Sequence, residues 1–396
     1  MIWDLSGASN LEFRILYSAM FNPLNFFKKI PKQPENFIAL DFGTTSTKAF
    51  IFSLPAGRQA SNEQVQLLGK GKGTPSEAVE QAADEAGLRP QQAVVALGGQ
   101  NCWSLTTTIR LNRPHPEKEI RPDEIQKLNE QIFKTAQIKA AVQMPQFTGD
   151  LELIPQLIDS ETLYYKLDGR VYSPGRSATG EGGQVLEASI STAYSPTAHL
   201  QQLSKTLKEL NLDLWAVSSL MFILVKALAN GRPKDFNALI LDIGGEITDL
   251  AVVFGGGVWG SVPLPIGGET FTDALIKRLA FDKKEAKEEK IAYAKRQIRE
   301  ERSLKIEKAL ESVKDLWLSG VETALQNFEG IKTFPPRIIL TGNGARLEQL
   351  KEHLSDYPLM KTLPFTSPPT VEVRTDIGPQ DMRLVGEEIW RESNES

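Results

Sequence analysis

Two short segments of the chain contain the residue types that bind phosphate. Residues 41–48 read DFGTTSTK, and residues 242–249 read DIGGEITD. Glycine in a tight turn lets backbone N–H groups approach an anion closely, because no Cβ intervenes. Hydroxyl groups add hydrogen-bond donors, and a lysine adds a mobile positive charge suited to phosphate oxygens. The spacing predicts two phosphate-binding turns, with contacts from Asp41, Gly43, Thr44, Thr45 and Lys48 in the first and from Asp242, Gly244, Gly245 and Thr248 in the second.

The aspartate that opens each turn needs a separate explanation, because a carboxylate repels phosphate. A Mg²⁺ ion with its water molecules can lie between the two groups. We therefore expect Asp41 and Asp242 to contact Mg²⁺ through water. The alternative is that each segment is only a hairpin turn, where aspartate and glycine are common. Two copies with matching flanks favour the phosphate site over that alternative.

A third glycine-containing segment follows later in the chain. Residues 337–340 are an apolar strand pattern, and residues 341–347 read TGNGARL before a helical pattern. A turn of this kind allows a flat ring and a ribose to lie against the backbone near a helix N-terminus. Because this turn follows two phosphate turns in the sequence, we predict that it contacts the nucleoside part of a nucleotide, through Gly342, Asn343 and Gly344.

The elements around the turns repeat. An apolar strand pattern precedes each phosphate turn, at residues 37–40 and 238–241, and another follows it, at 49–52 and 250–254. Such a repeat predicts two related lobes with a ligand cleft between them, so the predicted phosphate contacts should line one cleft.

Further patterns complete the outline. Thr74, Pro75 and Glu77 have the spacing of a helix start with a capping box. Other expected elements are a buried strand at 94–97, a helix at 197–210, a buried helix at 215–229 and a solvated helix at 283–308. Alternating segments at 104–111 and 185–192 flank a helical pattern at 123–140, which indicates a small inserted α+β subdomain.

These patterns divide the chain into six parts. They are an N-terminal apolar prefix (1–35), the start of the first lobe (36–104), the inserted subdomain (105–197), a return to the first lobe (198–236), the second lobe (237–390) and a tail (391–396).

Composition excludes several classes of protein. The net charge of −5 gives no general attraction to nucleic acid, so no nucleic-acid partner is expected. The single cysteine, Cys102, excludes an internal disulfide and a cysteine-rich metal site. The 3 histidines are far apart in the sequence, which makes a histidine-based zinc site or catalytic triad a poor explanation.

The N-terminal prefix is rich in large apolar residues. Residues 11–27 read LEFRILYSAMFNPLNFF and precede Lys28 and Lys29, whereas the tail at 391–396 is polar and acidic. Large apolar side chains next to basic residues are typical of segments that contact anionic lipid. Residues 1–31 are therefore a candidate for peripheral membrane contact, and the alternatives are packing on the body of the protein or a disordered extension.

The motifs resemble those of a known superfamily. LDFGTTSTK, LDIGGEITDL with the following PIGGETFTDAL, and IILTGNGARLEQL are similar to the two phosphate motifs, the connecting segment and the adenosine motif of the actin and heat-shock-chaperone ATPases. Residues 180–190, GEGGQVLEASI, resemble the start of the inserted subdomain of FtsA, and residues 267–273, GGETFTD, resemble a GGD-x-IT-x-D segment of that family. The chain therefore resembles the bacterial FtsA/PilM branch.

The resemblance implies a fold and a ligand. The fold is an α/β, actin-like, two-lobed, duplicated ribonuclease-H-like fold with an inserted α+β (SHS2-like) subdomain. The implied cofactors are ATP and Mg²⁺, and the resemblance adds Gly267, Gly268 and Lys290 to the nucleotide contacts.

The resemblance also implies a role. An FtsA-like protein is a cytoplasmic, self-associating cell-division adaptor that links a tubulin-like FtsZ ring to the inner face of the cell membrane. One alternative is a PilM-like scaffold of type IV pilus or secretion assembly, with a pilus-assembly protein as its partner. A second alternative is a sugar or acetate kinase, for which the sequence offers no recognisable substrate pocket or catalytic acid.

Three segments depart from the family pattern. Glu246 and Ile247 stand where glycine and threonine are usual, and Ser218-Ser219 aligns with an acidic-proline element. The family's Ala-Glu pair appears as Ala286-Lys287. Hydrolysis requires a group that positions the attacking water, and no catalytic residue can be named from these motifs. We expect nucleotide binding with slow or no hydrolysis.

Overall fold

The computed structural model describes residues 35–53, 66–149, 153–172, 178–229, 235–328 and 330–375. The apolar prefix before residue 35 and the polar tail lie outside these residues. No helix within the described ranges is both long enough and apolar enough to cross a membrane.

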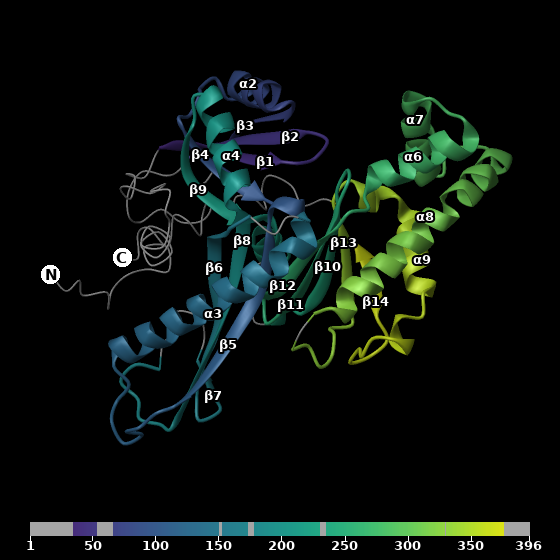
Figure 1. Cartoon of the computed structure of the whole chain (residues 1–396). Coiled ribbons are helices and arrows are strands. Elements are labelled where there is room, and N and C mark those ends of the chain that lie inside the picture. Colours follow the sequence, from purple (N-terminus) through teal and green to yellow (C-terminus); the bar gives the residue numbers. More distant parts are fainter. Residues whose placement is uncertain are drawn as a thin grey trace.

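The first lobe is built on a sheet of five described strands. Its helices are α2 (Pro75–Ala86), which packs on β2 and β3, and α4 (Thr197–Glu209), which contacts β9 (Figure 1). In spatial order the strands are β3 (Gln66–Gly73), β2 (Thr47–Ser53), β1 (Asn36–Phe42), β4 (Gln92–Leu97) and β9 (Asp213–Ser219).

The second lobe and the inserted subdomain share a sheet of nine described strands. In spatial order these are β14 (Thr370–Val373), β13 (Arg337–Thr341), β10 (Ala238–Ile243), β11 (Thr248–Phe254), β12 (Gly257–Leu264), β5 (Trp103–Asn112), β8 (Val185–Pro196), β6 (Pro155–Leu167) and β7 (Arg170–Tyr172). The second lobe also contains the helices α6 (Gly268–Leu279), α7 (Lys283–Ala294), α8 (Glu300–Gln326) and α9 (Glu348–Asp356).

The two halves of the chain repeat one arrangement of strands. In the first lobe, β1 pairs with β2 antiparallel and with β4 parallel. In the second lobe, β10 pairs with β11 antiparallel and with β13 parallel. The predicted α/β fold with two related lobes is confirmed.

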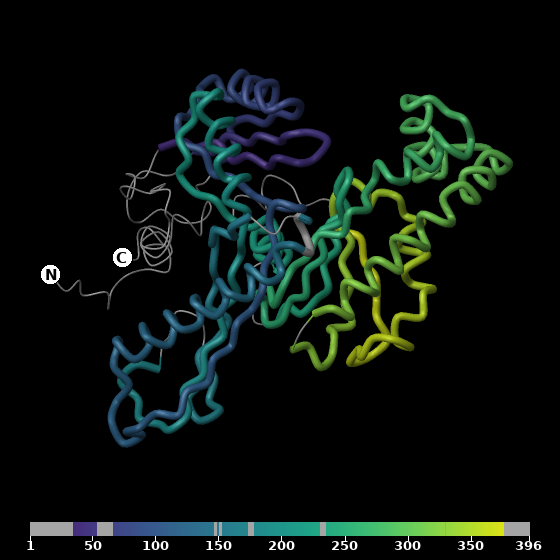
Figure 2. The backbone as a smooth tube through the Cα atoms, in the orientation of Figure 1, coloured from purple at the N-terminus to yellow at the C-terminus, as the bar shows by residue number. Residues whose placement is uncertain are grey.

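The inserted subdomain is joined to the second lobe. Its strand β5 pairs with β12 through two residue pairs, Leu105 with Gly260 and Ser104 with Ser261. The hydroxyl groups of Ser104 and Ser261 are 2.8 Å apart and hydrogen-bonded. Figure 2 shows the inserted segment extending away from both lobes, beside the green strands of the second. Its helix α3 (Pro122–Thr148) packs on β5, β6 and β8 and runs further than the predicted 123–140.

One apolar core reaches into both lobes. Helix α5 (Leu220–Ala229) contacts β4 and β9 of the first sheet and β11 and β12 of the second. The cluster around it joins first-lobe side chains such as Ile38 to second-lobe side chains such as Ile240. A second cluster lies beneath α6 and α8 of the second lobe.

Two predicted helices differ in the structure. Residues 215–229 contain the end of strand β9 and then helix α5, because a buried parallel strand and a buried helix have the same continuous apolar pattern. Residues 283–308 contain two helices, since α7 ends at Ala294 and Arg296 has a left-handed backbone with φ of 55°.

Candidate nucleotide-binding site

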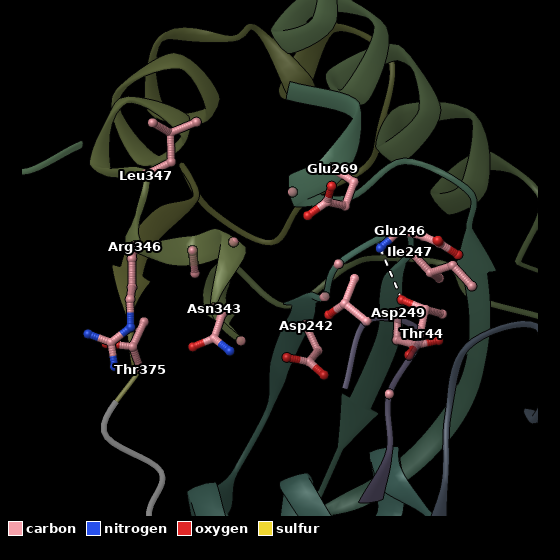
Figure 3. A pocket seen from close by; sticks show the side chains of 18 of the residues that line it. Thr44, Asp242, Glu246, Ile247, Asp249, Glu269, Asn343, Arg346, Leu347 and Thr375 are labelled. Carbon is pink, nitrogen blue, oxygen red and sulfur yellow. Dashed lines mark hydrogen bonds between the residues drawn. The ribbon is translucent and has the colours of Figure 1, made fainter. Parts of the chain in front are cut away.

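A cavity of about 1270 Å³ lies where the turns of both lobes meet. Figure 3 shows Thr44 from the first lobe close to Asp242, Glu246 and Asp249 from the second, with Asn343 on the other side of Asp242. All but two of the predicted contacts line the cavity. The lining contacts are Asp41, Gly43, Thr44, Thr45, Lys48, Asp242, Gly244, Gly245, Gly268, Lys290, Gly342, Asn343 and Gly344.

The two phosphate turns have the same backbone shape. A Cβ added at Gly43 would lie 2.9 Å from the carbonyl oxygen of Ser46. At the equivalent position in the second turn, a Cβ at Gly244 would lie 3.0 Å from the carbonyl oxygen of Ile247. Each turn therefore requires glycine at this position, and the chain supplies it twice.

The two turns are in direct contact. The backbone N–H of Glu246 donates a hydrogen bond to Thr44 Oγ1 at 3.2 Å, which is the dashed line in Figure 3. A Cβ at Gly245 would lie 2.3 Å from Thr45 Cγ2. Residues from opposite halves of the chain thus meet at one end of the cavity.

The repeated motif carries different charges in its two copies. Strand pairing places Lys48 opposite Asp41, and Lys48 Nζ is 2.6 Å from Asp41 Oδ2. Burial alone would lower the pKa of Lys48, but the Asp41 carboxylate outweighs this effect and the pKa is raised. The equivalent pairing in the second lobe places Asp249 opposite Asp242. The first turn therefore holds an ion pair, and the second holds two acids.

Asp249 is a cavity residue that sequence analysis did not identify. It accepts a hydrogen bond from the backbone N–H of Gly99, with N–O distances of 2.8 and 3.0 Å to its two oxygens. This contact connects the second lobe to the first, where Gly99 begins a short 3₁₀ helix after β4. Alignment of the second motif with the first identifies this residue, because Asp249 then occupies the position equivalent to Lys48.

The two acids of the second turn have raised pKa values. Burial raises the pKa of Asp242 to about 6, and the negative charge of Asp41 adds to this effect. Burial and the charge of Asp242 raise the pKa of Asp249 to about 8, against the effect of the Gly99 N–H. Near neutral pH, Asp249 therefore carries a proton for much of the time. A divalent cation would favour the ionised form of both groups and release protons on binding.

The third glycine turn lies against the second phosphate turn. Gly342 has φ of 80°, and a Cβ there would lie 2.4 Å from Asp242 Oδ1. A Cβ at Gly344 would lie 2.3 Å from Ile243 Cγ2. Only glycine permits this approach, which leaves a smooth backbone surface on the cavity beside Asn343.

The opposite wall comes from α6 and α7. Lys290 Nζ donates to the carbonyl oxygen of Gly268 at 2.6 Å and to Thr272 Oγ1 at 2.7 Å. Burial lowers the pKa of Lys290, although Glu269 opposes this shift. Lys287, which stands where the family has glutamate, forms an ion pair with Glu269 at 3.0 Å.

Two predicted contacts do not lie on the cavity wall. Thr248 is fully buried, donates its hydroxyl to the carbonyl oxygen of Ile266 at 2.7 Å and accepts from Trp317 Nε1 at 3.1 Å. Side chains alternate along a strand, so Thr248 points away while its neighbour Asp249 faces the cavity. Gly267 lies behind the second turn, where a Cβ would be 2.6 Å from the carbonyl oxygen of Gly245.

The chemical groups that line the cavity match those that bind a nucleotide together with Mg²⁺. Exposed backbone at the glycine turns, two lysines and the paired acids are the groups that phosphate and hydrated Mg²⁺ require. Among the residues that the structure describes, no group of three or more acidic, histidine or cysteine side chains could hold a metal ion by itself. Contact of Asp41 and Asp242 with Mg²⁺ through water stays a prediction.

Comparison with known proteins shows which proteins the chain is similar to. No protein-family model matches it. The cell division protein FtsA of Pseudomonas aeruginosa is 22% identical over 373 residues, which cover 83% of each chain. A solved structure of the PilM-PilN type IV pilus biogenesis complex is 17% identical, with a TM-score of 0.58 and coverage of 92% of this chain and 98% of that chain. The ethanolamine utilization protein EutJ of Carboxydothermus hydrogenoformans is 13% identical, with a TM-score of 0.45 and coverage of 89% and 91%.

The chain has an actin-like fold with two lobes. It is similar in sequence to FtsA and in fold to the PilM-PilN complex.

Proposed function

We propose that the protein is an actin-like adaptor that binds an adenine nucleotide, ATP or ADP, together with Mg²⁺ in the interlobe cavity. One observation carries the proposal. Two glycine turns of the same length and strand register, from the two halves of the chain, meet at a cavity that a third glycine turn also lines. In this assignment Lys48 and the turn backbones contact phosphates, and Asp41 and Asp242 hold hydrated Mg²⁺.

Calorimetry of the full chain tests nucleotide binding. Asp242→Ala should weaken Mg²⁺-nucleotide binding by more than about tenfold, since a hydrogen bond to a charged group is worth about 1.5–3 kcal/mol. Asp273→Ala is the matched control, because Asp273 is an exposed aspartate of α6 outside the cavity. Equal affinities for the wild type and the Asp242 variant would contradict the assignment.

Sequence similarity to FtsA supports a cell-division role. In this role the protein self-associates at the inner face of the cell membrane and links a tubulin-like FtsZ ring to it. Fold similarity to the PilM-PilN complex supports a second candidate, a scaffold of pilus assembly. A pull-down from native lysate, with and without nucleotide, separates the two. Nucleotide-dependent capture of an FtsZ-type protein would favour the first role, and capture of a PilN-type protein would favour the second.

Residues 1–31 are the proposed membrane contact, on the basis of their apolar and basic composition alone. The full chain should sediment with anionic liposomes, and a chain starting at Gln33 should stay in the supernatant. Equal sedimentation of the two would contradict this proposal.

A further inference from the structure

The structure points to a preference within this site. We propose that the cavity holds a nucleoside diphosphate in preference to a triphosphate, and that Glu246 is the residue that disfavours the terminal phosphoryl group. This inference rests on the proposed function and concerns which nucleotide the same cavity retains.

The first argument is the contact between the two phosphate turns. Between them, the phosphate turns of a two-lobed site present N–H and hydroxyl donors to a phosphoryl group. Here the N–H of Glu246 is bonded to Thr44 Oγ1, so this donor already has a partner. Gly245 also lies against the side chain of Thr45, where even a methyl group would clash at 2.3 Å. A terminal phosphoryl group between the turns would have to break the hydrogen bond and separate the lobes at this point.

The second argument is the charge at this end of the cavity. Glu246 is exposed at the place where the turns meet, and its carboxylate adds negative charge beside those of Asp41 and Asp242. Figure 3 shows Glu246 on the side of Thr44 and Asp249, away from Asn343. On the first-lobe side, Lys48 is already paired with Asp41, and Lys72 lies opposite Lys48 in the pairing of β2 with β3. A triphosphate brings more negative charge than a diphosphate, so it meets the larger repulsion here.

The third argument is that the other end of the cavity lacks this restriction. Gly342 and Gly344 present backbone to the cavity beside Asn343 and Arg346, and α7 contributes Lys287 and Lys290. Those groups do not distinguish a diphosphate from a triphosphate. Discrimination is therefore expected at the turn contact alone, where Glu246 replaces the glycine that is usual in the family.

Calorimetry with two nucleotides tests the inference. ADP and a non-hydrolysable ATP analogue are titrated, each with Mg²⁺, into the full-length wild type, Glu246→Gln and Glu246→Gly. The wild type should bind ADP at least about tenfold more tightly than the analogue. Glu246→Gln removes the charge and Glu246→Gly also removes the side chain, so both should strengthen binding of the analogue and leave the ADP affinity nearly unchanged. Glu352→Gln, on the same cavity, should leave the ratio of the two affinities unchanged.

The outcomes are distinguishable. Equal affinity of the wild type for the two nucleotides, or an equal change for both in Glu246→Gln, would overturn this inference and leave the proposed function standing. Failure of both nucleotides to bind the wild type would overturn the proposed function and this inference together.

Discussion

At the scale of single residues, one backbone motif carries two different charge patterns. Strand pairing places Lys48 and Asp249 at equivalent positions, so the first turn neutralises its aspartate and the second does not. The electrostatic consequence is that burial raises the pKa of both acids, and the charge of Asp242 raises the pKa of Asp249 further. The second turn thus places two carboxyl groups side by side, and a bound cation would stabilise their ionised forms.

Asp249 should make the stability of the nucleotide-free protein depend on pH. Its folded pKa of about 8 lies above the ordinary value of 3.8. A raised folded pKa means that its contribution to stability is complete at low pH and is lost as the pH rises through about 8. Asp249→Asn removes this loss and keeps an acceptor for the Gly99 N–H. In thermal unfolding without Mg²⁺, the melting temperature of the variant relative to that of the wild type should rise by about 2 °C or more between pH 5 and pH 8.5.

The control for this measurement is Asp273→Asn, which changes an exposed aspartate. A constant difference between Asp249→Asn and the wild type at every pH would contradict the prediction.

The predicted contacts show what can be derived from residue type. Glycine, hydroxyl and lysine positions in the turns could be predicted, because close approach to phosphate restricts the choice of residue. The direction of a strand side chain could not be predicted one residue beyond the turn. The sequence pattern predicts a contact from Thr248 and none from Asp249, whereas in the structure Asp249 faces the cavity and Thr248 faces Trp317.

At the scale of elements, the strands that flank the turns were predictable and β3 was not. Strands β1, β2, β10 and β11 are short apolar runs next to glycine turns, which is a strong local signal. Strand β3 reads QLLGKGKG, and glycine is normally depleted in strands. Its glycines have a packing reason that only the structure shows. A Cβ at Gly69 would lie 2.2 Å from the carbonyl oxygen of Ala82, and one at Gly71 would lie 2.0 Å from that of Ala78, both in α2.

Gly71→Ala should therefore destabilise the first lobe. The added methyl group would meet helix backbone, which cannot rotate aside as a side chain can, so α2 must move away from the sheet. Overpacking of this kind costs about 1–3 kcal/mol. Urea unfolding should show this loss, while Lys70→Ala, one residue earlier on the exposed side of β3, should change stability by less than about 0.5 kcal/mol. A Gly71 variant as stable as the wild type would show that α2 and β3 are not packed as described.

At the scale of the whole molecule, two features of the described residues join the lobes besides the contacts of the turns. The inserted subdomain continues the sheet of the second lobe through β5 and β12. Helix α5 lies between the two sheets and contributes to a core that includes strands of both. The repeat predicted two lobes with a cleft, but it could not predict these links, because they depend on segments that occur once in the chain.

A shared core predicts that the lobes lose stability together. Phe222 of α5 is 2% exposed and belongs to the cluster that spans both sheets. Phe222→Ala should cost about 3–5 kcal/mol, and hydrogen exchange should quicken in β1 and in β10 alike. Leu304→Ala on α8 is the control, because that side chain is 57% exposed and should leave both strands protected. If β10 kept its full protection in Phe222→Ala while β1 lost it, the two lobes would be independent folding units. The cavity between them would then depend on contacts outside that core, among them Gly99 with Asp249 and Thr44 with Glu246.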